Sequence, residues 1–222
     1  MKRQHLLIGL VAAAAVALSV IAYFLMTGGS QTTVTANAER SGFTITSEDR
    51  TLGSPKAPVL MVEYAAPTCP VCAAFDMTVF PQIKAQYIDT GKVYYVFRVY
   101  PLSSVDVAAE GMARCLPRQN YIPFIDMLYR NQPKWDPDGH DIPDVHGALV
   151  QMGAEAGMAA AEVDSCIGNP TQQAHTTAVG KEAADKYGVS GTPTFFVNGQ
   201  MRVGVGTPDD WRTFLDGLLA KK

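Results

Sequence analysis

The sequence is short of charge, and the charges it has are unevenly placed. Only 18% of its 222 residues are Asp, Glu, Lys or Arg, and no acid precedes Glu39. Lys2 and Arg3 stand near the start, while the other basic residues are scattered among 21 acids and form no cluster. A nucleic-acid-binding protein depends on grouped cations that neutralise phosphates, so this class is excluded.

Hydrophobic residues, in contrast, make up 47% of the chain. That share is too high for a disordered protein. About 180 residues follow the N-terminal segment, which is enough to bury a core without a dense disulfide scaffold. The four cysteines are therefore available for other roles.

The first segment is predicted to be an export signal outside the fold. Lys2 and Arg3 precede an apolar stretch from Leu6 to Met26. A helix of this length spans roughly 30 Å, the thickness of a hydrocarbon core. Positive charge before the stretch directs the rest of the chain out of the cytoplasm. Residues 1–26 are predicted to be a transmembrane anchor.

A cleaved signal peptide is the alternative, because Ala36-Asn37-Ala38 has the small-x-small pattern of a cleavage site. In that case the mature protein would be soluble, with its start near Ala38. Residues 27–42 are rich in Thr, Gly, Ser and Asn and are predicted to be a solvated tether. Residues 43–222 would then form the folded domain.

The folded part alternates strand and helix patterns in a recognisable order. A β-branched run at 59–64, a helical pattern with Pro81 inside it, and a second strand at 93–100 predict a parallel βαβ unit with a kinked helix. The Ala-rich and Met-rich residues 103–187 predict several short helices. A hairpin at 194–205 and a helix at 211–220 follow. The predicted fold class is α/β, and this order of elements resembles a thioredoxin-like fold with a helical insertion between the βαβ half and the ββα half.

Two cysteines with two residues between them carry the chemistry. In Cys69-Pro70-Val71-Cys72, the first sulfur lies where a strand leads into a helix. Unpaired N–H groups and the helix dipole favour a thiolate there, and Cys72 lies one turn along, in position to resolve a mixed disulfide. An inert bridge or half of a zinc site are the alternatives, but zinc needs two further ligands at short spacing and none lies within about forty residues of the pair.

These features together resemble the DsbA-like thiol:disulfide oxidoreductases of bacterial periplasms. The resemblance covers roughly residues 45–220. It is carried by Glu63 six residues before Cys69, by the Cys-Pro-x-Cys helix start, by the helical insertion and by Gly191-Thr192-Pro193-Thr194. Thr51-Leu52-Gly53-Ser54-Pro55 and Asn131-Gln132-Pro133-Lys134-Trp135 are similar to the same family.

The resemblance implies a role for each matching residue. Cys69 would be the nucleophile and Cys72 the resolving cysteine. Pro193 would be a cis-proline lying against the pair, with the backbone of Thr192 exposed to an extended substrate. Glu63 would be a buried proton acceptor for Cys72, because burial raises a carboxyl pKa toward neutrality. A salt-bridged surface acid is the alternative for Glu63.

One departure from the family concerns oxidising power. The family's best-known oxidant has a histidine where this chain has Val71. Histidine stabilises the thiolate by charge and hydrogen bonding, and a more stable thiolate makes the pair more oxidising. We therefore expect a weaker oxidant.

Cys115 and Cys166 lie 51 positions apart in the helical insertion. In an oxidising compartment they are predicted to form a structural disulfide. Two buried free thiols or a second, regulatory redox pair are the alternatives. His140, His146 and His175 are interpreted as ordinary side chains, so no metal site is expected.

The predicted function is the introduction of disulfides into exported proteins, with no bound cofactor. Unfolded or reduced exported proteins would be the substrates, and a membrane partner would reoxidise the pair. We expect a periplasmic monomer, tethered to the inner membrane by its N-terminal segment. The alternatives are a disulfide isomerase or reductase of the same fold, and a chaperone or binding protein with incidental redox activity.

Overall fold

A computed structural model describes residues 41–221. The predicted anchor at 1–26, and all of the predicted tether before Ser41, lie outside the described residues. Among the residues that are described, no helix is long and apolar enough to span a bilayer.

A mixed five-stranded sheet lies at the centre of the molecule, in the order β1-β3-β2-β4-β5. β2 and β3 run parallel, and the other neighbouring strands pair antiparallel. The strands are β1 (Arg50–Leu52), β2 (Val59–Ala65), β3 (Val93–Val99), β4 (Thr194–Val197) and β5 (Gln200–Val203). The predicted βαβ unit and hairpin are thus present, and the short edge strand β1 is an addition.

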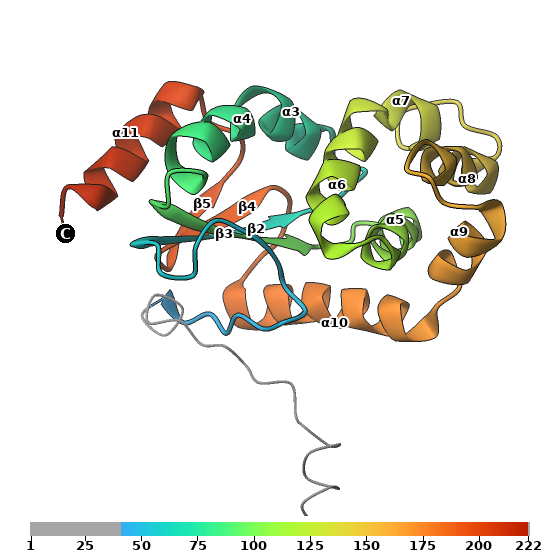
Figure 1. Ribbon diagram of the computed structural model, residues 1–222, viewed down its shortest axis with the longest axis horizontal. Helices are drawn as coiled ribbons and strands as arrows, with labels where there is room; N and C mark the ends of the chain where they lie inside the picture. Colours follow the sequence, from blue (N-terminus) through green and yellow to red (C-terminus); the bar gives the residue numbers. More distant parts are fainter. Residues whose placement is uncertain (1–40, 222) are drawn as a thin grey trace, which may run out of the picture.

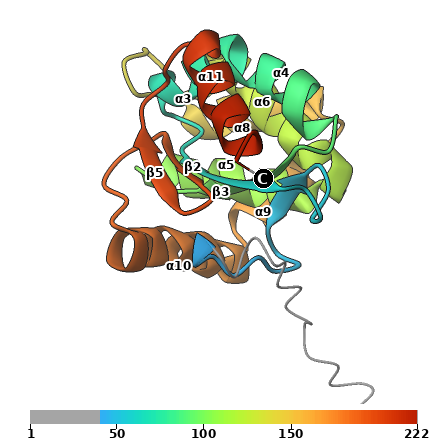
Figure 2. The same cartoon turned by 90° about the vertical axis from the view of Figure 1, so that its left-hand side faces the viewer.

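Helices cover both faces of the sheet (Figures 1 and 2). α3 (Pro70–Thr78), α4 (Phe80–Ile83) and α11 (Pro208–Leu219) lie on one face, and α10 lies on the other. Except for α10, the insertion packs beside the sheet. Its helices are α5 (Ser104–Cys115), α6 (Tyr121–Arg130), α7 (Gln132–Trp135), α8 (Val145–Glu155), α9 (Ala160–Ile167) and α10 (Pro170–Tyr187), with a 3-10 turn at Arg118–Asn120.

The pattern around Pro81 explains the break in the first long helix. α3 ends at Thr78, and Pro81 lies in the first turn of α4, where its missing N–H costs no helical hydrogen bond. The chain continues through a π-helical turn at Lys84–Ile88. The predicted kink is therefore confirmed as a break between two helices. α10, in contrast, has 18 residues and is longer than the short helices predicted for the insertion.

Successive side chains of β2 point to opposite faces of the sheet and pack in two different cores. Val59, Met61 and Ala65 pack in the core that includes α3 and α11, whereas Leu60, Val62 and Tyr64 pack in the core beneath α10. Glu63 belongs by the same alternation to the α3 face. A carboxyl group is thereby placed inside an apolar core, directly under the helix that carries the cysteines.

The local sequence explains the turn between β4 and β5 and the start of α11. Asn198 and Gly199 both have positive φ, at 49° and 82°, as the tight turn between β4 and β5 requires. Thr207 caps α11 in a reciprocal capping box with Asp210, and Pro208 occupies the first turn. These elements agree with the sequence-based prediction.

Candidate active site

Cys69 is the N-cap residue of α3, at the point where the chain leaves β2. Its sulfur accepts the backbone N–H of Cys72 at 3.3 Å. Both cysteines are free thiols in this structure. The N-cap position therefore aims unpaired helical N–H groups at this sulfur, as the sequence predicts.

The pKa values of the two thiols are shifted in opposite directions. The pKa of Cys69 is lowered to about 6, first by a hydrogen bond with the Cys72 side chain and further by Thr192 and by the backbone N–H groups of Cys72 and Val71, although burial opposes the shift. The pKa of Cys72 is raised well above its ordinary value, chiefly by burial. At neutral pH the pair holds one thiolate, at Cys69, and one proton, on Cys72.

Access to the pair is from one side. Cys72 is fully buried, and Cys69 retains 5% of its surface. The two residues that follow Cys69, Pro70 and Val71, are both exposed, Val71 at 44%. An incoming sulfur can thus approach Cys69 beside the start of α3, whereas Cys72 is shielded from direct attack.

The loop before β4 lies against Cys69. The Thr192–Pro193 peptide bond is cis, and the Cys69 thiol donates to the backbone oxygen of Thr192 at 3.5 Å. The Thr192 hydroxyl is buried and has no hydrogen-bond partner among residues 41–221. This hydroxyl is free to donate to the sulfur once Cys69 ionises, in agreement with its effect on the pKa.

Glu63 is 3% exposed and accepts the hydroxyl of Tyr95 at 2.7 Å. Burial raises its pKa to about 8, against the smaller lowering effect of the Tyr95 hydrogen bond. Glu63 also raises the pKa of Cys72 through its charge. A carboxyl group whose pKa is raised to about 8 holds its proton at neutral pH.

Two buried polar side chains, to which the sequence alone assigned no role, hold the loop in front of α3. Asp106 accepts the backbone N–H of Thr68 at 2.9 Å and that of Leu102 at 2.8 Å. The Gln132 amide donates to the backbone oxygens of Pro67 at 2.8 Å and Cys69 at 3.2 Å. The insertion thus fixes the backbone from which Cys69 projects. The only sequence signal for Asp106 was a capping pattern with Ser103.

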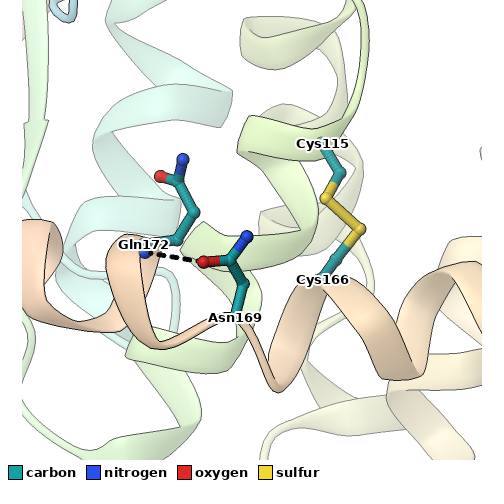
Figure 3. The surroundings of a disulfide bond; sticks show 4 residues. All are labelled: Cys115, Cys166, Asn169 and Gln172. Carbon is teal, nitrogen blue, oxygen red and sulfur yellow. Dashed lines mark hydrogen bonds between the residues drawn. A yellow bond between two sulfur atoms is a disulfide. The ribbon is translucent and has the colours of Figure 1, made fainter.

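The insertion is itself closed by a disulfide between Cys115 at the end of α5 and Cys166 in α9 (Figure 3). The Cα atoms lie 6.1 Å apart. Asn169, beside the bridge, caps α10 by accepting the N–H of Gln172 at 3.2 Å. This bridge is far from Cys69 in sequence and uses neither cysteine of the pair.

Within residues 41–221 no group of three or more His, Cys, Asp or Glu side chains is arranged to hold a metal ion. His146 contacts Asp164 at 2.7 Å on the surface. Trp135 and Trp211 are buried in the core, and so are Met112, Met152 and Met158.

Comparison with known proteins shows the family to which the chain belongs. A family model described as Thioredoxin matches residues 46–217, and the chain belongs to this family. A Rickettsia typhi protein provisionally named protein-disulfide oxidoreductase is 36% identical over 170 residues, which cover 74% of this chain and 60% of that protein. The chain thus spans about three fifths of the length of this relative.

Solved structures agree with the family assignment. Wolbachia pipientis alpha-DsbA1 superimposes with a TM-score of 0.72 at 28% identity, covering 79% of this chain and 92% of that one. BdbD from Bacillus subtilis, at 20% identity and a TM-score of 0.66, shares the fold. The predicted DsbA-like resemblance and the thioredoxin-like fold with a helical insertion are both confirmed.

Proposed function

We propose that this protein is a thiol:disulfide oxidoreductase that introduces disulfides into exported proteins through Cys69 and Cys72. The observation that carries the proposal is the N-cap position of Cys69, whose sulfur accepts the Cys72 N–H at 3.3 Å and has a pKa lowered to about 6. A thiolate that is stable at neutral pH is a good leaving group, so the disulfide readily passes to a substrate.

The proposed reaction begins with the oxidised pair. A substrate thiolate attacks the Cys69 sulfur, the Cys69–Cys72 bond breaks, and the electrons go to Cys72, which takes a proton from Glu63. A second substrate thiolate then attacks the substrate sulfur of the mixed disulfide and releases Cys69 as a thiolate. The substrate has lost two electrons and the pair has gained them.

Thr192 and Pro193 are proposed to hold the substrate during these steps. Their loop lies within 3.5 Å of the Cys69 sulfur, and proline has no N–H to compete for the substrate backbone. An extended substrate chain would pair with the backbone of Thr192 while its cysteine reaches Cys69. The Cys115–Cys166 bridge is proposed to be structural.

The cellular setting is part of the proposal. Substrates would be reduced or unfolded exported proteins in the periplasm, and a membrane partner would reoxidise the pair. The N-terminal segment would tether the domain to the membrane, with release after cleavage near Ala38 as the alternative, and the domain would act as a monomer. Similarity to the Rickettsia relative supports the chemistry of this proposal.

Equilibration with mixtures of reduced and oxidised glutathione tests the function. We expect the Cys69–Cys72 pair to be more oxidising than thioredoxin, whose potential is about −270 mV. The fractions of dithiol and disulfide are counted by mass after acid quenching. A potential at or below that of thioredoxin would favour the reductase alternative. Val71 is consistent with that alternative, because its side chain adds no positive charge to stabilise the Cys69 thiolate.

A Cys69→Ser variant separates the enzyme from the chaperone alternative. An oxidase loses all transfer of disulfides to a reduced substrate protein, because no sulfur remains to be attacked. A chaperone keeps its suppression of aggregation in the same variant. The Cys115→Ala/Cys166→Ala variant is the matched control, since it removes two cysteines and leaves the proposed pair intact.

A further inference from the structure

β5 forms one edge of the sheet (Figure 2). Within residues 41–221 it pairs with β4 alone. A strand at an edge presents backbone N–H and C=O groups that a further strand can bind. β5 contains no proline, and its register with β4 is continuous. Neither a proline nor a bulge therefore protects this edge.

The hairpin geometry shows which backbone groups of β5 face outward. Gly204, directly after the strand, donates its N–H to the Pro193 oxygen at 3.1 Å. In an antiparallel pair, residues that bond to the partner strand alternate with residues whose N–H and C=O point away from it. Arg202, two residues before Gly204, therefore bonds toward β4. The N–H and C=O groups of Met201 and Val203 face the open edge.

Two apolar side chains of β5 are left in solvent beside that edge. Met201 lies opposite Phe196, which belongs to the core beneath α10, and Val203 shares its face by alternation. Met201 is nevertheless 46% exposed and Val203 is 72% exposed. An added strand with apolar side chains on this face would cover both.

Arg202 points to the opposite face and carries an unpaired charge. Its guanidinium carbon lies 4.9 Å from the centre of the Trp211 ring and 4.2 Å from that of Phe214. Among the described residues, the guanidinium group has no hydrogen bond or ion pair. Asp210 on α11 accepts the N–H and hydroxyl of Thr207 instead, at 2.9 and 2.7 Å. Two aromatic rings thus orient a cation whose N–H groups are available to a carboxylate.

We propose that the open edge of β5 binds an extended segment of a protein substrate as a sixth strand, through an apolar–acidic–apolar sequence. The two apolar side chains of the segment lie beside Met201 and Val203, and the acidic side chain between them lies on the other face, beside Arg202. Main-chain hydrogen bonds supply affinity, and the alternate side chains supply selectivity. That the segment belongs to a substrate rests on the proposed function.

The edge lies near the loop at which the substrate cysteine is proposed to react. Gly204 bonds to Pro193, and the Thr192 oxygen lies 3.5 Å from the Cys69 sulfur. A segment bound along β5 is therefore only one strand away from that loop. Holding one part of a substrate there raises the effective concentration of its cysteine at Cys69.

A second copy of this chain fits the edge less well. In the antiparallel register that uses Met201 and Val203 of both copies, the two Arg202 side chains lie directly opposite each other. Like charges in that position destabilise a sheet. An acidic segment removes this repulsion and gives Arg202 an ion pair.

Binding of a cysteine-free peptide to the full chain tests the docking edge. The probe is fluorescently labelled Thr-Val-Glu-Val-Thr, measured by fluorescence anisotropy. We expect it to bind about fivefold more tightly than the same peptide with lysine in place of glutamate, the effect of one exposed ion pair. Methylation of both valine N–H groups should abolish binding. Absence of binding, or equal affinity for the glutamate and lysine peptides, would overturn the proposal.

Variants of β5 test the same contacts from the protein side. Arg202→Glu should reverse the preference, so that the lysine peptide binds more tightly than the glutamate peptide. Val203→Pro removes an outward N–H and leaves the bonds to β4 intact, so the glutamate peptide should bind about tenfold more weakly. Val203→Thr, which keeps that N–H, is the matched control and should bind within about twofold of wild type. Unchanged affinity in Val203→Pro would refute the edge even if Arg202→Glu does not fold.

Sedimentation tests the other occupant. We expect the wild type and Val203→Pro to be monomers. A wild-type dimer that Val203→Pro dissociates would overturn the proposal, because a second copy would then cover the edge.

Single-turnover oxidation separates this inference from the proposed function. The oxidised protein is mixed with a peptide that carries two cysteines and a Gly-Ser linker before Thr-Val-Glu-Val-Thr, and the peptide loses two electrons to the Cys69–Cys72 pair. We expect the N-methylated form of this peptide to react about tenfold more slowly. If neither form is oxidised, the proposed function fails and the binding measurements alone decide the docking edge. If both are oxidised at the same rate, the proposed function stands and the docking role is refuted.

Discussion

Asp106 and Thr68 are 38 residues apart, yet the Asp106 carboxylate accepts the Thr68 N–H at 2.9 Å. Thr68 directly precedes Cys69. The second carboxylate oxygen accepts the N–H groups of Leu102 at 2.8 Å and Ser103 at 3.0 Å. One buried side chain therefore holds the loop before α3 and the start of α5 together, and so fixes the insertion to the reactive cysteine.

Replacement of Asp106 by asparagine should be strongly destabilising. The amide cannot accept on both sides, so its NH₂ group faces the N–H groups of Leu102 and Ser103, and buried donors are left unpaired. We expect a loss of about 2–4 kcal/mol in the free energy of unfolding. Urea denaturation followed by circular dichroism measures it.

Asp185→Asn serves as the comparison for this prediction. Asp185 forms an exposed pair with Lys181, and such pairs contribute less than about 1 kcal/mol. An Asp106→Asn protein as stable as Asp185→Asn would show that the Asp106 contacts do not hold the loop.

Glu63 should make stability depend on pH. Burial raises its pKa from 4.5 to about 8. Above pH 4.5 the unfolded chain releases a proton that the folded protein retains, so the free energy of unfolding falls as pH rises toward 8. At pH 7 this penalty amounts to about 3 kcal/mol, and below pH 4 it vanishes.

Glu63→Gln removes the penalty because glutamine does not titrate. We expect the variant to be more stable than wild type by about 3 kcal/mol at pH 7 and equally stable at pH 4. Urea titrations at both pH values measure the difference. An equal difference at the two pH values would mean that Glu63 does not titrate as its burial requires. Glu182→Gln, on the surface of α10, is the control.

Loss of the Cys115–Cys166 bridge should affect stability more than chemistry. A loop of 51 residues contributes about 4 kcal/mol in the chain-entropy model. The Cys115→Ala/Cys166→Ala variant is expected to lose about this amount in urea denaturation and to keep the reactivity of Cys69 in the folded state. A variant with normal stability but no disulfide transfer would instead favour the regulatory alternative.

Substitution of Val71 tests whether a positive charge next to Cys69 stabilises its thiolate. It is 44% exposed, so a larger ring has room there. Val71→His places a cationic or hydrogen-bonding group beside Cys69, which should lower the Cys69 pKa by about one unit and raise the potential by about 30 mV. Val71→Leu, which keeps the residue apolar, should change neither. Glutathione equilibration of the two variants measures the shift.

The sequence predicted the order of strands and helices along the chain in the two halves and the helix start at Cys69, because both depend on local patterns. Hydrophobic runs define β2 and β3, and Pro70 and Pro208 mark the first turns of their helices. β1 escaped prediction because Arg50–Leu52 has no apolar alternation of its own and is a strand only through its pairing with β3. β1 therefore depends on a contact with a strand that is distant in the sequence.

The pair itself was predictable, but its supporting residues were not. Cys69 and Cys72 are close in sequence, and Glu63 falls on the inner face of a strand by simple alternation. Asp106 and Gln132 bond to backbone atoms 38 and 65 positions away. No spacing rule identifies such contacts, because they depend on how the insertion packs against α3.

The most direct test of the proposed function is the ionisation of Cys69 in the reduced protein. The rate of its alkylation is measured by mass between pH 4 and 9, with Cys72→Ala confirming which thiol reacts. We predict a half-maximal rate near pH 6, with Cys72 unmodified in the wild type. A midpoint near pH 8.5, as for an ordinary cysteine, would contradict the claim that the start of α3 stabilises the Cys69 thiolate.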